Sequence, residues 1–96
     1  MNIEITKNNE GLVIALDGRL DTMTAPELES AICKNYDGTG TLTFDCEKLL
    51  YISSAGLRVL LAVQKKTRGD MQLVNVCELV MEVLDVTGFA DILTIK

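Results

Sequence analysis

Hydrophobic and polar residues alternate with two different periods along the chain, and the changes of period divide it into short elements. Residues 3–7 alternate with the period of a strand, and the Asn-Asn-Glu-Gly run at 8–11 has the chemistry of a hairpin turn. Residues 12–16 return as a second, more apolar strand. Three further strands are predicted, over 41–46, 71–76 and 91–95.

Helical periodicity separates the later strands. The first predicted helix starts at Thr24, whose side chain can cap it, and Glu27 three residues on completes a capping box. It stops before Gly38. Two more helices are predicted, from about 53 to 67 and over 78–87.

The resulting order is β-β-α-β-α-β-α-β within one domain, residues 1–96. Strands separated by helices imply parallel β-α-β units, and the first hairpin adds one antiparallel strand. We therefore expect an α/β fold with a mixed, mostly parallel sheet.

Composition narrows the class of protein. The formal net charge of −5 argues against nucleic acid as a partner, because phosphate binding needs a basic face. The N-terminal segment lacks the pattern of a signal peptide, and no apolar run approaches the roughly 20 residues of a membrane span. A cytoplasmic protein without membrane contact is expected.

The sequence contains no motif that indicates catalysis or metal binding. There is no His, no glycine-rich phosphate loop and no clustered set of metal ligands, so we predict no enzyme activity, catalytic residue, metal or cofactor. The cysteines Cys33, Cys46 and Cys77 are far apart and favour buried thiols over a disulfide or zinc site.

The junction at Ser53 and Ser54 is the most informative segment. An apolar run, Leu49 to Ile52, changes here to helical periodicity, and either hydroxyl can cap the first turn. The same helix end tolerates a phosphate, because it has unpaired N–H groups and the positive end of the helix dipole. Gly56 disfavours the helix, which leaves two readings: a partner approaches closely there, or a neighbouring strand packs against it.

A helical projection places one stripe beside the serine. Ser54, Arg58, Leu61 and Lys65 fall near the edge opposite the apolar arc of Leu57, Leu60 and Val63, and should be at least partly exposed. Phosphorylation of Ser54 is therefore expected to change the surface without unfolding the domain.

Three segments stand out as motifs: Gly-Arg-Leu-Asp-Thr-Met-Thr-Ala at 18–25, Tyr-Ile-Ser-Ser-Ala-Gly-Leu-Arg-Val-Leu at 51–60, and the helix-glycine-strand segment at 83–92. Together they resemble the stand-alone STAS (SpoIIAA-like) domains that act as anti-sigma factor antagonists. The second is similar to the family signature D-S-(S/T/A)-G-L and is the most specific.

The resemblance implies a partner switch. The unphosphorylated antagonist binds an anti-sigma factor that is also a serine kinase and thereby releases its target; phosphorylation breaks the complex and a PP2C-type phosphatase restores it. Alignment on Gly56 puts Ser54 at the phosphorylated position. Ser53 stands where relatives usually have an acid, and it is a competing phosphosite. A monomer is expected when free.

The resemblance also implies a contact surface around the serine. Asp21 matches the aspartate of the family's elbow, and the same carboxylate has a structural reading as a turn or cap residue. The predicted partner-binding residues are Asp21, Thr22, Ser53, Ser54, Gly56, Arg58 and Leu61.

One alternative function stays open. A STAS domain can be a non-switching interaction subunit, for instance an accessory protein of a lipid-transport ATPase. Ser54 would then be only a cap and contact residue.

Overall fold

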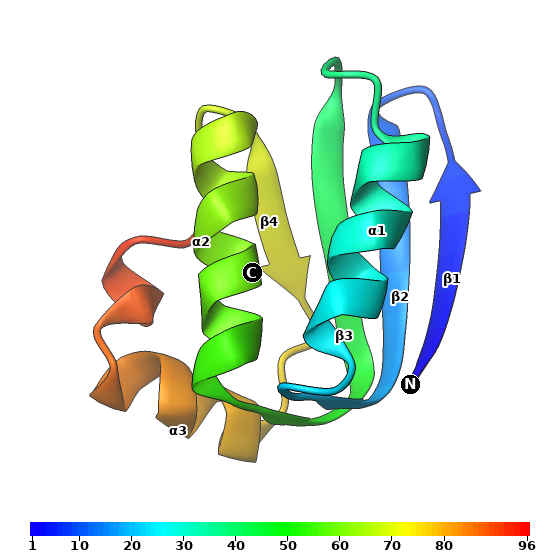
Figure 1. Ribbon diagram of the computed structural model, residues 1–96. Helices are drawn as coiled ribbons and strands as arrows, with labels where there is room; N and C mark the ends of the chain where they lie inside the picture. The colour runs from blue at the N-terminus through cyan, green and yellow to red at the C-terminus, as the bar shows by residue number, and fades with distance from the viewer.

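A computed structural model describes residues 1–96 and contains one four-stranded sheet with the order β1-β2-β3-β4. β1 (Asn2–Lys7) runs antiparallel to β2 (Gly11–Leu20). β3 (Thr41–Ile52) and β4 (Met71–Val74) add to it in parallel (Figure 1). The expected mixed, mostly parallel sheet is confirmed.

Helices lie on one face and at one end of this sheet. α1 (Ala25–Asn35) and α2 (Ser54–Lys66) cover the face turned toward the viewer in Figure 1. α3 (Glu78–Val86) and the short 3-10 helix η1 (Phe89–Asp91) lie at the lower left, beside the start of α2. None of these helices combines the length and the apolar character that a bilayer crossing requires.

The core forms between the sheet and the two covering helices. Alternate residues of the central strands point into it, and Ile14 of β2 and Phe44 of β3 are fully buried. The opposite face of the sheet carries polar side chains, of which Gln72 donates a hydrogen bond to Thr43 across β4 and β3, 3.0 Å long. Strand alternation thus gives one buried and one open face.

β2 and β3 are longer than the patterns predict, by four and six residues at their ends. They stay paired as far as Leu20 and Ile52, with bulges on the way. Exposed polar residues in both extensions, such as Asp17 and Lys48, hide the alternation in the sequence. The extra pairing carries both strands to the same edge of the domain.

The strand predicted over 91–95 is wrong in all but one residue. After Gly88, whose φ of 81° is left-handed, the chain turns into η1, and the N–H groups of Asp91 and Ile92 donate to carbonyls within that turn. Pairing with the sheet is limited to one parallel bridge between Ile95 and Leu73 of β4, in which the Leu73 N–H donates to the Thr94 carbonyl and the Lys96 N–H donates to the Leu73 carbonyl. Local hydrogen bonds therefore replace most of the expected ladder.

Candidate functional site

The carboxyl ends of β2 and β3 bring two loops together. Leu20 and Ile52 are the last register pair of these strands, and the Ser53 N–H donates to the Leu20 carbonyl over 2.9 Å. Asp21 and Ser53 directly follow the paired residues. The first and second predicted segments therefore meet at the edge of the sheet where α/β domains commonly place their sites.

Asp21 organises the loop between β2 and α1. Its Oδ1 accepts hydrogen bonds from the N–H groups of Met23 and Thr24, 3.0 and 3.2 Å long. The Thr24 hydroxyl accepts the Asp21 N–H and donates to the Arg19 carbonyl. The turn reading of Asp21 is confirmed.

The predicted capping box of Thr24 and Glu27 is wrong. Thr24 has nearly helical backbone angles, and its side chain makes no capping hydrogen bond. Its hydroxyl instead points back to the loop, because Asp21 and Arg19 offer it partners there.

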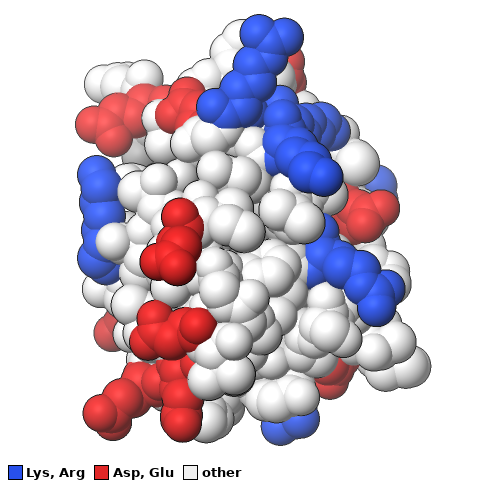
Figure 2. All heavy atoms as spheres, turned by 90° about the vertical axis from the view of Figure 1, so that its left-hand side faces the viewer, with Lys and Arg blue, Asp and Glu red and all other residues white.

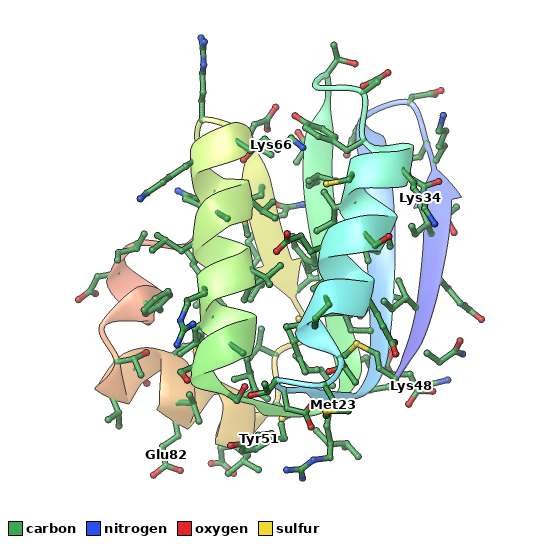
Figure 3. The ribbon with its side chains drawn as sticks, viewed as in Figure 1. Met23, Lys34, Lys48, Tyr51, Lys66 and Glu82 are labelled. Carbon is green, nitrogen blue, oxygen red and sulfur yellow. The ribbon has the colours of Figure 1, made fainter.

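Arg19 fixes Asp21 from the other side. Its Nε lies 3.9 Å from Asp21 Oδ2, and these two side chains form the only ion pair in the structure. Its guanidinium carbon lies 4.2 Å from the centre of the Tyr51 ring, a distance typical of a cation–π contact. Figure 3 labels Tyr51 near Met23 at the lower end of the molecule, close to the start of α2. One charged side chain thus joins the two strand ends.

These contacts set the protonation of Asp21. Burial acts to raise the pKa of its carboxyl, but the hydrogen bonds from Thr24 and Met23, together with the charge of Arg19, hold that pKa below its ordinary value. A lowered pKa means that the folded state binds the proton less readily than the unfolded state. Asp21 therefore contributes stability above its unfolded pKa, and this contribution is lost as the pH falls through the folded value.

We expect Asp21→Asn to lower the melting temperature at pH 7, and this difference from the unmodified chain should shrink below about pH 4. Thermal unfolding followed by circular dichroism between neutral and acid pH measures it. Asp37, whose pKa is also lowered, is present in both proteins and drops out of the difference. A difference that stays constant down to acid pH would show that the Asp21 charge does not stabilise the loop.

Ser53 occupies the N-cap position of α2, but its side chain makes no capping bond. Its backbone is extended, with φ −103° and ψ 177°, as at an ordinary N-cap. Its Oγ is buried and has no hydrogen-bond partner. The expected side-chain cap is absent at Ser53, and its hydroxyl is buried in this conformation although the residue as a whole is half-buried.

Ser54 is the accessible member of the pair. It is the first residue of α2 and is exposed, and its hydroxyl makes no hydrogen bond within the chain. The N–H groups of the first helical turn have no partner inside the helix. A phosphate on Ser54 would lie beside these donors and the positive end of the α2 dipole.

Gly56 is a packing residue. It is buried, and a Cβ added to it would lie 2.7 Å from Leu20 Cγ and 2.9 Å from Ile52 Cγ1. Of the two readings of this glycine, close packing against the strands is confirmed. The place of Gly56 among the partner-binding residues stays a prediction, and its burial against the strand ends leaves little of it for a partner to touch.

The stripe predicted along α2 is confirmed. Ser54, Arg58 and Lys65 are exposed and Leu61 is half-buried, whereas Leu57, Leu60 and Val63 lie in the core. Arg58 has no acidic partner within the chain, so its charge is free for another molecule. Thr22 in the first loop is also exposed.

The sequence reasoning missed three exposed apolar side chains around this edge. Met23 is 82% exposed in the loop after β2, Leu50 is 62% exposed near the end of β3, and Leu79 is 55% exposed in α3, which follows β4. Met23 and Leu50 lie near the carboxyl ends of β2 and β3, where Asp21 and Ser53 also lie, and Leu79 lies in the helix that follows β4. Methionine at the tip of a polar loop was the signal available for Met23.

The prediction of buried thiols holds for Cys46 and fails for Cys33. Burial raises the pKa of the Cys46 thiol to about 12, with the charge of Asp45 acting in the same direction. Cys77 is half-buried, and its thiol lies 3.5 Å from the Leu49 carbonyl oxygen. Cys33 is exposed on α1, because it lies on the helix edge away from Leu28 and Ile32.

Comparison with known proteins agrees with the fold and the motifs. The protein-family model of the STAS domain matches residues 2–96 of this chain. A Bordetella bronchiseptica protein, BtrV, assigned by name to the anti-sigma factor antagonists, is 35% identical over 96% of this chain and 83% of its own length. The anti-sigma-B factor antagonist of Bacillus subtilis is 26% identical over 100% of this chain and 91% of its own.

Solved structures show the same fold. An anti-sigma factor antagonist from Mycobacterium paratuberculosis superposes with a TM-score of 0.87 at 22% identity, over 98% of this chain and 83% of its own. SpoIIAA from Bacillus in its phosphorylated form superposes with a TM-score of 0.71 at 18% identity, over 99% and 91%. The chain therefore belongs to the STAS domain family, and its similar relatives are anti-sigma factor antagonists.

Proposed function

We propose that this protein is an anti-sigma factor antagonist that is switched off by phosphorylation of Ser54. The unphosphorylated form binds an anti-sigma factor with serine kinase activity and releases the target that this kinase holds. A PP2C-type phosphatase removes the phosphate and restores binding. The observation that carries the proposal is the difference between the two serines: Ser54 is exposed at the helix end, and the Ser53 hydroxyl is buried.

The surface around Ser54 suits a protein partner. Asp21 is held in place by its loop, and Thr22 and Arg58 are exposed beside the helix start. Leu61 and the apolar Met23 supply contact area that excludes water. A solved relative in the phosphorylated form supports the chemistry of the switch.

Phosphorylation changes this surface more than the fold. The Ser54 hydroxyl makes no hydrogen bond within the chain that a phosphate would break, and the helix dipole favours added negative charge. The phosphate adds roughly −1.5 to −2 charges at pH 7. It therefore acts on the partner's contact by repulsion and by occupying space.

The direct test is phosphorylation by the kinase encoded nearest to this gene. Incubation with that kinase and Mg-ATP, followed by peptide mass mapping, should place one phosphate on Ser54 and none on Ser53. Ser54→Ala should take up no phosphate and should still bind the kinase. Absence of phosphate uptake by the unmodified chain would count against the switch and favour a non-switching accessory subunit of a transport complex.

A further inference from the structure

A groove runs between α1 and α2 on the helical face. Its lower part is lined by Thr22, Ala55 and Arg58 together with residues of α1, and its upper part extends to Lys66. Glu29, Cys33 and Val59 line both parts, so the groove is continuous from the start of α2 to its last turn. Figure 1 shows the two helices side by side in front of the sheet.

Small side chains keep the groove open. Ala55 and Ala62 on α2 face Ser30 and Cys33 on α1, and none of these reaches across. The floor is apolar, because Val59 and other core residues form it. These floor residues are nearly buried, so the exposed apolar surface of the groove comes mainly from Cys33 and Ala62 on its walls.

The charged side chains of α2 are all positive. Residues 54–69 contain four of the chain's nine Lys and Arg residues and no Asp or Glu, whereas residues 70–95 contain five acidic residues and no basic one. Figure 2 shows basic side chains mostly over the upper and right-hand part of one face and acidic ones mostly along its left side. Arg58 and Lys66 bring this positive charge to the edge of the groove.

We propose that the groove binds an amphipathic segment of the kinase partner that carries acidic side chains toward α2. The inference rests on the proposed function and extends its contact surface from the helix start to the far end of α2. Continuity supports it, because Thr22 and Arg58 line the groove and lie in the contact surface around Ser54. The charged lining is Arg58 and Lys66 on α2 and Glu29 on α1, none of which forms an ion pair within the chain. The α2 side is therefore positive and the α1 side negative, which selects a segment whose acidic side chains face α2.

The groove gives the kinase a second point of attachment. Its exposed apolar walls, Cys33 and Ala62, contribute contact area, while the two cations set the orientation of the bound segment. Phosphorylation at one end then leaves the far end unchanged. The complex is therefore held at two places, of which only the one at Ser54 is switched.

Two matched charge reversals test the groove. Lys66 lies in the last turn of α2 toward α1, and Lys34 lies in the last turn of α1 on the side away from α2 (Figure 3). Both reversals change net charge equally and remove a cation from a helix C-terminus. We expect Lys66→Glu to weaken binding of the unphosphorylated chain to the kinase about fivefold at low salt, and Lys34→Glu to change it less than about twofold.

Alkylation of Cys33 gives an independent readout. This exposed thiol lines the groove, whereas Cys46 is buried. Bound kinase should slow the labelling of Cys33 by iodoacetamide tenfold or more. Peptide mass mapping measures the labelling rate. The kinase-bound complex of Lys66→Glu should show the same protection once saturated, because the segment still fills the groove.

The outcomes separate this inference from the proposed function. Suppose that Ser54→Asp abolishes kinase binding, but that Cys33 of the unmodified chain is labelled as fast in the kinase complex as in the free chain. The switch then stands and the groove proposal fails. Equal effects of Lys66→Glu and Lys34→Glu would show a dependence on net charge alone and would also overturn it. If the chain does not bind the kinase at all, both proposals fall.

Discussion

Replacing Ser54 with aspartate is expected to weaken binding of the kinase partner tenfold or more while leaving the melting temperature unchanged or slightly raised. The carboxylate adds negative charge at the exposed start of α2, beside the residues proposed to contact the kinase. Loss of one close contact of this kind corresponds to about 1.4 kcal/mol or more of binding free energy. Titration of the purified chain against the kinase, with ADP bound to prevent phosphorylation, measures the affinity.

Stability should move in the opposite direction, if at all. An acidic residue in the first helical turn interacts favourably with the dipole by about 0.3–1 kcal/mol, and α2 has no acidic residue there. The Ser54 side chain buries nothing that the substitution would expose, since it is already at the surface. A large fall in the melting temperature would mean that Ser54 supports the fold and would contradict a surface switch.

Ser53→Ala is the matched control. Its hydroxyl is buried without a hydrogen-bond partner, so its removal takes away no bond and relieves an unsatisfied polar group. We expect kinase binding, phosphate uptake and melting temperature all to stay close to those of the unmodified chain. If Ser53→Ala abolishes phosphate uptake and Ser54→Ala does not, the assignment of the two serines is reversed.

Periodicity predicts the elements of this fold better than it predicts their ends. The three helices and four of the five strands lie where the pattern places them. The ends of β2 and β3 depend on pairing with each other, which no local pattern contains. The last strand fails for a related reason, because hydrogen bonds within the turn after Gly88 compete with a short edge strand.

In the candidate site, too, local patterns predict some features, whereas others depend on contacts between distant segments. The serine junction and Asp21 are readable as motifs, and the exposed stripe of α2 follows from helical geometry. Which serine is buried does not follow, since it depends on the Ser53 N–H bonding to the Leu20 carbonyl at the end of another strand. The capping box fails because Arg19 and Asp21 offer the Thr24 hydroxyl better partners than its own helix.

Gly56 connects the fold to the site, and Gly56→Ala is expected to lower stability by about 1–2 kcal/mol. Overpacking a buried position costs about 1–3 kcal/mol, and the helix propensity of alanine over glycine offsets up to about 1 kcal/mol of it. The added methyl group would lie within 3.0 Å of Leu20 and Ile52 side-chain carbons that are themselves fully buried. The melting temperature should fall by about 5–15 °C.

A double-mutant cycle identifies the cause. Leu20→Ala removes the closest atom to the added methyl group, so Gly56→Ala should cost less in that background than in the unmodified chain. Strictly additive effects on the free energy of unfolding, measured by urea denaturation, would rule out the clash with Leu20. The same clash pushes the start of α2 away from the strand ends, where Ser53 N–H bonds to Leu20. Gly56→Ala should therefore also weaken kinase binding, because Ser54 and Asp21 no longer keep their relative positions.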